Sequence, residues 1–223
     1  MTDTEPDASP TLVSDRTGRR AHQTSAATLA NDTGLRQTLD RIWHLLSRGV
    51  ADRKSAFHTP TIATTHATDR TPALRTVILR ACTPRRNQLA FHTDRRSQKY
   101  EDLLIDPTLT IHVYDPKPRI QVRLTATGTL HHKDEVSEQV WHETSARSLQ
   151  IYQQITPPGR PIPEPLTEDI RTNDQAPQAG YKNFCVILAT IQTIEWLHLT
   201  SSGHRRARFQ WQHNAWEGTW LAP

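Results

Sequence analysis

The sequence contains no apolar run of the roughly 20 residues that a membrane-spanning helix needs, and only 35% of its 223 residues are hydrophobic. Its first twenty residues carry acids and prolines, whereas a secretory signal needs a cationic start followed by an apolar stretch. These absences predict a soluble, cytoplasmic protein with no membrane partner. A chain of this length and composition is expected to form one domain around one hydrophobic core.

Cysteine and glycine are both scarce. The two cysteines, Cys82 and Cys185, lie in apolar strand-like runs, where a reduced thiol packs as a small hydrophobic group. We therefore expect neither a disulfide framework nor a metal site. With only eight glycines, and neither a GxGxxG nor a GxxxxGKS/T pattern, the sequence excludes a nucleotide site built on a glycine-rich loop. HExxH and GxSxG motifs are also absent, so most of the 12 histidines are interpreted as surface or interface residues.

The formal net charge of +4 suggests an anionic partner. Lys and Arg are scattered through every segment, with only local RR pairs, which suits discrete phosphate-sized sites better than a nucleic-acid stripe. Nucleic-acid binding through the basic surface remains an alternative, and it would show a steep salt dependence. Four tryptophans could in principle stack on bases, but they are not interleaved with cations as base-stacking platforms are. We therefore predict that they lie in the core or at a dimer interface. They are Trp141, Trp211, Trp216 and Trp220.

Composition divides the chain into three parts. Residues 1–32 are rich in Thr, Ser, Asp, Ala and Pro without periodicity, and we interpret them as a disordered N-terminal tail. Residues 33–223 are predicted to form a single folded domain. Within it, residues 155–181 hold six prolines and no apolar period, which predicts an irregular loop long enough to be functional.

Helical spacing of apolar residues from Leu35 to Leu46, with Thr33 as an N-cap, predicts a first helix. Two more are expected over 97–105 and about 133–153. The remaining apolar segments are short, β-branched and separated by turns, as in hairpins. The architecture predicted is a mainly β fold, an antiparallel β-barrel decorated with helices. The expected strands are TPTIATTHAT, ALRTVILRAC, LAFHT, TLTIHVYD, IQVRLTATGTLHH, KNFCVILATIQTIEWLHL, HRRARFQWQ and AWEGTWLA.

A polar cluster follows the strand-like run LAFHT. Thr93 and Ser97 supply hydroxyl groups, Lys99 supplies a charge, and Ser97 opens a helix whose first N–H groups are unpaired. Arg75 and Arg80 lie on the preceding strand, which a hairpin would bring alongside. Because arginine matches phosphate oxygens bidentately, this cluster is a candidate site for one phosphate monoester.

A structural explanation of the same residues remains open at this stage. Ser97 could simply cap the helix, while the arginines are solvated or pair with nearby acids, namely Asp94, Glu101 and Asp102. Arg75 and Arg80 also have opposite parity on a flat strand, so they face opposite sides unless a bulge or twist intervenes.

Four motifs in order resemble the pyridoxamine 5'-phosphate oxidase family of FMN-binding split barrels. They are RTVILR (75–80), FHTDRRSQK (91–99), QVRLTATG (121–128) and the C-terminal IEWLHLTSSGHRRARFQWQHNAWEGTWLAP. The resemblance covers residues 35–223 and implies an FMN-binding split β-barrel. It also implies a homodimer in which the flavin lies between the subunits.

Carried over position by position, the resemblance implies an FMN site whose residues come from all four motifs. Gln121 would bond the isoalloxazine edge, and Ser97 and Lys99 would belong to the phosphate site. The complete cofactor set implied is Arg75, Thr76, Val77, Ile78, Leu79, Arg80, His92, Thr93, Ser97, Gln98, Lys99, Gln121, Trp196 and Arg208.

Departures from the family pattern concern the substrate. Members that oxidise pyridoxine phosphate hold its phosphate with a YxxxRPxxS motif, but WHETSARSL places Trp141, Ser145 and Leu149 there. The C-terminal RxHxRF pair is altered as well, so Arg80, His204 and Arg206 are the substrate-orienting candidates. The sequence thus predicts an FMN-dependent oxidoreductase of unknown small-molecule substrate, with no catalytic residue assigned. A non-catalytic flavin carrier or sensor is the alternative.

Overall fold

The computed structural model describes residues 17–165 and 177–223. The strands are β1 (Thr61–Thr65), β2 (Pro72–Thr76), β3 (Leu79–Thr83), β4 (Gln88–Asp94), β5 (Thr108–Asp115), β6 (Ile120–His131), β7 (Phe184–His198), β8 (Arg205–Gln212) and β9 (Ala215–Leu221). The α-helices are α1 (Thr17–Ala51), α2 (Gln98–Ile105), α3 (Glu135–Glu143) and α4 (Ala146–Leu149). Short 3-10 helices are η1 (Ala56–His58), η2 (Pro84–Arg86), η3 (Gln150–Gln153) and η4 (Pro177–Asn183).

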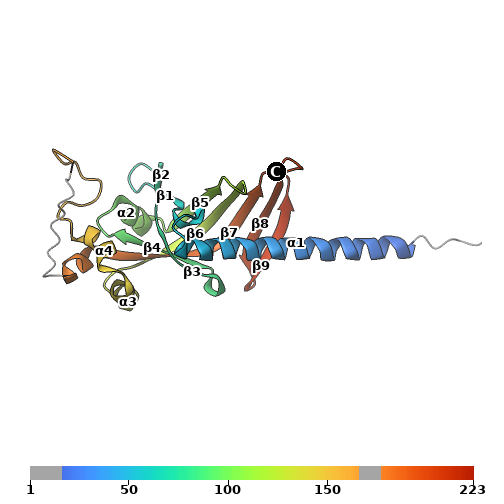
Figure 1. Cartoon of the computed structure of the whole chain (residues 1–223), viewed down its shortest axis with the longest axis horizontal. Helices are drawn as coiled ribbons and strands as arrows, with labels where there is room; N and C mark the ends of the chain where they lie inside the picture. Colours follow the sequence, from blue (N-terminus) through green and yellow to red (C-terminus); the bar gives the residue numbers. More distant parts are fainter. Residues whose placement is uncertain (1–16, 166–176) are drawn as a thin grey trace, which may run out of the picture.

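The strands form one antiparallel sheet in the order β2-β1-β5-β6-β7-β4-β3, with β8 added to β7 and β9 to β8. The long strand β7 organises it, since its first half pairs with β4 and its second half with β8. Strand β6 pairs along nearly the whole of β7 and shifts register between Thr125 and Ala126. Figure 1 shows the resulting curvature, with β8 and β9 at the end of the sheet away from α2. This is the mainly β, antiparallel architecture that the sequence predicts.

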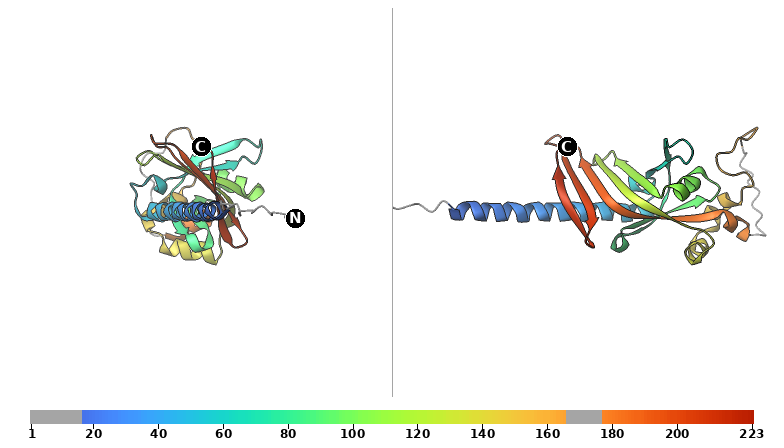
Figure 2. Two further views of the ribbon diagram at one scale, coloured as in Figure 1. Left: turned by 90° about the vertical axis from the view of Figure 1, so that its right-hand side faces the viewer. Right: turned by 180° about the vertical axis from the view of Figure 1, so that it is seen from behind.

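Helix α1 begins earlier than the sequence analysis expects. It starts at Thr17, so residues 17–32 of the expected tail are helical, and residues 1–16 lie outside the described residues. The helix therefore runs through Thr33 rather than being capped there. Alanine is frequent between 21 and 30 and no proline interrupts the segment, so local propensity lets the helix extend. Figure 2 shows α1 reaching beyond the β8–β9 end of the sheet.

The segment ALRTVILRAC forms two strands and not the single strand expected. Strand β2 pairs with β1, whereas β3 pairs with β4, and the chain passes between these partners at Val77 and Ile78. The Val77 N–H donates to the Pro60 carbonyl at 2.9 Å, which fixes the crossing. Because the strand breaks here and β3 has a bulge between Leu79 and Ala81, the alternation expected of one flat strand does not connect Arg75 with Arg80.

The helix expected over 133–153 is divided into α3, α4 and η3. Helix α3 ends where Thr144 leaves the helical region at φ −86°, ψ 136°, and Ser145 is also extended. Its start is well defined, because Asp134 and Ser137 form a reciprocal capping box. The expected loop 155–181 is irregular through residue 165 and helical from Pro177, and residues 166–176 lie outside the described residues.

Two hydrophobic clusters lie on the sheet. The larger one joins α1, through residues such as Ile42 and Leu46, to the inward side chains of β4 to β8. The smaller one packs Trp141 and Tyr152 against Phe184 at the start of β7. These clusters fix β3, β4 and the segment after α3 relative to one another, which positions the side chains described next.

Candidate functional site

Two hydroxyl groups and an ammonium group meet at the start of α2. Thr93 and Ser97 are both buried, at 3% exposed each, and their hydroxyl oxygens lie 3.0 Å apart. The half-buried Lys99 donates from Nζ to the Thr93 hydroxyl at 3.1 Å. These are the three residues that the sequence analysis assigns to a phosphate site, and the fold brings them together.

Arg75 also belongs to this cluster, and the buried carboxylate of Asp102 holds it there. Its guanidinium donates to the Thr64 hydroxyl and, at 3.3 Å, to Asp102 Oδ2. Asp102 is fully buried and also accepts hydrogen bonds from Thr64 at 2.6 Å and from Gln98 at 3.1 Å. Burial alone would raise the pKa of Asp102, but these hydrogen bonds and the Arg75 charge hold it below its ordinary value. Asp102 is therefore a carboxylate that fixes Arg75 in place.

Lys99 has no such partner among the described residues. Burial and the neighbouring charge of Arg75 lower its pKa, while Asp94 and Asp102 offset part of that shift. The two cations are thus close enough to repel each other. A bound anion would relieve this repulsion and favour the charged form of Lys99.

Helix α2 presents an uncapped start to the same place. Ser97 occupies the N-cap position with extended backbone, yet its side chain makes no capping hydrogen bond. Its hydroxyl group is instead hydrogen-bonded to the hydroxyl group of Thr93. The first N–H groups of a helix carry a partial positive charge. The cluster therefore combines two cations, two hydroxyls and a helix N-terminus, with one acid already paired to Arg75. This donor set fits a phosphate monoester.

The segment from Arg75 to Arg80 connects this cluster to a second group of cations around Arg80. Thr76 is exposed, Ile78 is 41% exposed, and Leu79 is buried at 1%. The half-buried Arg80 on β3 lines a pocket of about 630 Å³. An extended segment of this length spans at most about 17 Å between the two arginine Cα atoms. Backbone and side chains of this segment therefore link the two cationic sites.

His92 lies on β4, and its ring packs edge-on against Phe184 with 5.0 Å between the ring centroids. Burial, with a smaller contribution from the Arg80 charge, lowers its pKa to about 4. His92 is therefore neutral near pH 7 and adds no charge to the site.

This shift predicts an acid sensitivity of the fold. Between pH 6.5 and about 4 the unfolded chain binds a proton at His92 that the folded protein does not, so stability falls as the pH falls through this window. His92→Phe keeps the ring contact and removes the proton site. We expect the melting temperature of the variant to decline less than that of the wild type between pH 7 and pH 4. Equal declines would contradict the assignment.

Other residues implied by the resemblance lie elsewhere in the chain. Gln121 is at the start of β6, opposite Tyr114 and Leu197. Trp196 is 3% exposed in the larger hydrophobic cluster, and its indole N–H has no hydrogen-bond partner in the described structure. Within a single chain these residues make no hydrogen bond or ion pair with the described residues at the start of α2, so their roles in binding FMN stay predictions.

The three C-terminal candidates lie at the β8 end of the sheet. Arg208 donates to Glu195 Oε1 at 3.0 Å, and Arg206 donates to Glu195 Oε2 at 2.9 Å. Burial raises the pKa of Glu195, but its bonds to both arginines and the charge of Arg123 bring it below the ordinary value. His204 is exposed in the turn before β8. Sequence reasoning missed Glu195, whose position opposite Arg208 depends on the β7–β8 register.

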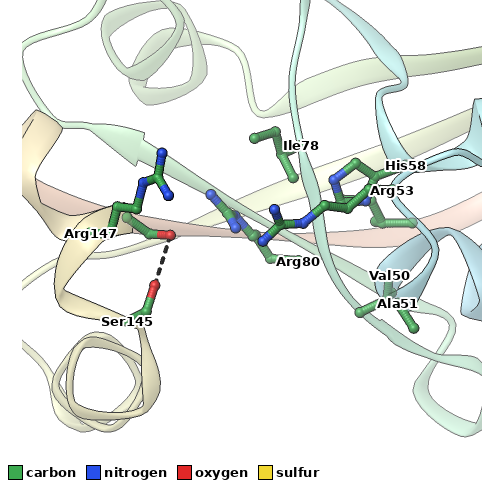
Figure 3. A pocket seen from close by; sticks show the side chains of 10 residues that line it. Val50, Ala51, Arg53, His58, Ile78, Arg80, Ser145 and Arg147 are labelled. Atoms are coloured by element: carbon green, nitrogen blue, oxygen red, sulfur yellow. Dashed lines mark hydrogen bonds between the residues drawn. The ribbon is translucent and has the colours of Figure 1, made fainter.

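The pocket beside Arg80 contains two further arginines that the sequence analysis did not identify. Arg53 follows α1 and Arg147 lies on α4, and Figure 3 shows the guanidinium groups of Arg53, Arg80 and Arg147 pointing into the same space. Ser145 and Ser148 lie on the α4 side, with a hydrogen bond of 3.0 Å between their hydroxyl oxygens. None of the ten lining residues is acidic.

The described residues include neither a membrane-spanning helix nor a metal-binding group of side chains. No helix there is long and apolar enough to cross a membrane. In the same part of the chain, His, Cys, Asp and Glu side chains form no group of three that could hold a metal ion.

The curved antiparallel sheet with a polar cluster at α2 defines the class, a split β-barrel. Residues 40–132 match the family model described as pyridoxamine 5'-phosphate oxidase, FMN-binding domain. This match contains Arg75, Arg80, Thr93, Ser97 and Lys99, and it confirms the resemblance to that family over the segment that builds the cluster. No curated protein sequence matches the chain.

Solved structures support the same fold. A pyridoxamine 5'-phosphate oxidase-related, FMN-binding protein from Nostoc punctiforme is 25% identical, with a TM-score of 0.66, covering 82% of this chain and 96% of its own. PhzG from Burkholderia lata, solved with tetrahydrophenazine-1-carboxylic acid, is 16% identical with a TM-score of 0.61, covering 83% and 91%. The second likeness concerns the fold alone.

Proposed function

We propose that the protein is an FMN-dependent oxidoreductase whose cofactor phosphate binds at the start of α2. The observation that carries this proposal is the pair of cations, Arg75 and Lys99, beside the two buried hydroxyls of Thr93 and Ser97. This cluster lies within the segment that matches an FMN-binding domain.

Each residue of the cluster has a distinct part in the proposed site. Lys99 supplies a charge that forms no ion pair with a described residue, and Thr93 and Ser97 supply short-range hydrogen bonds. Asp102 and Thr64 hold the Arg75 guanidinium so that its remaining N–H groups can face the anion. The segment 76–80 would then run along the isoalloxazine ring toward Arg80. Because the site forms before the ligand arrives, little ordering free energy is lost on binding.

Bound flavin would supply the redox chemistry, accepting two electrons from a reduced substrate. The side chains of this chain are needed to bind, orient and exclude water. No acid or base among them is assigned a proton transfer, and His92 is neutral near pH 7 and packed against Phe184. The substrate is proposed to bind at the pocket beside Arg80.

A homodimer is part of the proposal. Large apolar side chains are exposed on the two elements that hold Arg75 and Lys99: Leu74 on β2 is 66% exposed, and Leu104 and Ile105 on α2 are 61% and 67% exposed. Exposed apolar side chains on adjoining elements favour burial against a partner. A second subunit could also bring Gln121 and Arg208 to the flavin. A purely monomeric FMN-loaded protein in sedimentation would contradict this arrangement.

The oxidoreductase activity is tested with FMN-loaded protein under anaerobic conditions. Pyridoxamine phosphate, a set of other amine and alcohol donors, and nicotinamide donors would each be mixed with the protein while the visible flavin band is followed. We expect at least one donor to bleach the band. A flavin that stays bound but is bleached by none of them would contradict the activity and favour the carrier or sensor alternative.

A further inference from the structure

We propose that the pocket formed by Arg53, Arg80 and Arg147 binds a doubly charged anionic group of the substrate, such as a phosphate monoester or a dicarboxylate. This inference rests on the proposed function, because it assigns the pocket to the substrate of the same flavin site. Arg53 and Arg147 are the residues newly assigned, and neither belongs to the motifs that carry the family resemblance.

The charge of the pocket is not balanced by the protein. In the described part of the chain, no carboxylate forms an ion pair with any of the three arginines, whereas seven other arginines have acidic partners. Three guanidinium groups pointing into one space repel one another (Figure 3). A single anionic charge would leave an excess of positive charge, so a group with two negative charges suits the pocket better.

Neutral hydrogen-bond donors lie beside the arginines. Ser145 donates its hydroxyl proton to Ser148 Oγ at 3.0 Å, so the Ser148 proton is left to donate elsewhere. His58 also lines the pocket, and its Nδ1 donates to the Gly49 carbonyl at 2.7 Å, which holds the ring in place. Arginine forks with a hydroxyl donor form the usual environment of a bound phosphate or carboxylate pair.

One wall of the pocket is apolar. The apolar lining residues are Val50 and Ala51 at the end of α1 and Ile78 and Leu79 of the connecting segment. With about 630 Å³, the pocket has room for an organic body as well as an anionic group. The same residues 78–80 belong to the segment proposed to lie along the flavin, so a substrate anchored by its anion would sit next to the cofactor.

The pocket also accounts for a departure seen in the sequence. The YxxxRPxxS phosphate motif is not kept, and Trp141 and Leu149 from that stretch are buried in the smaller hydrophobic cluster. Because α3 ends at Glu143 and α4 starts at Ala146, Arg147 instead faces the pocket. Arg53 adds a cation from the opposite side. The anion site is thus built from different residues.

Isothermal titration of FMN-loaded protein tests the proposal, with inorganic phosphate and malonate as probes and chloride at equal ionic strength as the blank. Loading with FMN occupies the cluster at α2, so the titration reports the pocket. We expect Arg147→Gln and Arg53→Gln each to weaken phosphate or malonate binding by about tenfold or more. The exposed Arg86 on η2 is the matched control, and Arg86→Gln should change neither affinity. Tighter phosphate binding would indicate a phosphorylated substrate, and tighter malonate binding a dicarboxylate.

Flavin content measured on the same samples separates this inference from the proposed function. Full flavin with no binding of either probe, or with binding that Arg147→Gln and Arg53→Gln leave unchanged, would overturn the pocket assignment alone. If the protein takes up no FMN, the proposed function fails. The titration is then repeated in a Lys99→Met background, where phosphate binding lost on Arg147→Gln would still support the anion pocket and undiminished binding would overturn it.

Discussion

Lys99→Met is expected to weaken FMN binding by about 10- to 100-fold, the usual loss when a hydrogen-bonded charge is removed from an anion site. The substitution keeps most of the aliphatic stem and removes only the ammonium group. Folding should not suffer, because burial and the Arg75 charge already lower the pKa of Lys99 and its ammonium group forms no ion pair within the described part of the chain. FMN affinity is measured by the quenching of flavin fluorescence, and the flavin-free melting temperature is measured alongside.

Lys117→Met is the matched control, since Lys117 is exposed in the turn between β5 and β6, away from the cluster. It should bind FMN as the wild type does. If Lys99→Met also retains wild-type affinity, the phosphate site is not at the start of α2. A parallel expectation concerns pH: FMN affinity of the wild type should fall at alkaline pH, below the ordinary lysine value of 10.5, as Lys99 loses its proton.

Asp102→Ala is expected to destabilise the fold by about 3–5 kcal/mol, the typical cost of leaving one partner of a buried ion pair alone. Asp102 is fully buried and accepts four hydrogen bonds, from the Thr64 hydroxyl, the Ala67 N–H, the Gln98 amide and Arg75. The substitution leaves Arg75 and Thr64 without their acceptor. Chemical denaturation of the flavin-free protein gives the free energy of unfolding.

Glu101→Ala is the control for this experiment, because Glu101 is the exposed neighbour on α2 and its side chain makes no ion pair or hydrogen bond with the described residues. Its effect should stay within about 0.5 kcal/mol. Equal stabilities of Asp102→Ala and Glu101→Ala would contradict the supporting role of Asp102. Arg75 is proposed to bind the phosphate and also pairs with Asp102, so its substitution is expected to alter binding and stability together, and Lys99 is the cleaner probe of binding.

Much of the fold was predictable because local chemistry determines it. Asn87, in the turn before the strand-like run LAFHT, has φ 54°, a backbone conformation that asparagine tolerates, and the hairpin β3–β4 follows from it. Helix α2 was also predicted, since Ser97 begins it and Pro107 follows its end. The break between β2 and β3 was not predictable, because it depends on which distant strands, β1 and β4, are available as partners.

The candidate site divides in the same way. The sequence placed Thr93, Ser97 and Lys99 together because they are neighbours around one helix start. It named Asp102 among the acids that could pair with the arginines, and the structure does pair Asp102 with Arg75. Lys99, in contrast, forms no ion pair with a described residue. Arg53 and Arg147 carry no local signal, and only the packing of α1 and α4 around β3 brings them to Arg80.

The most direct test of the central claim is the visible absorption spectrum of the purified protein after FMN has been added and the excess removed. We expect a retained flavin spectrum close to one FMN per subunit in the wild type and a largely lost one in Lys99→Met. A wild-type protein that remains colourless after loading would contradict FMN binding at the start of α2.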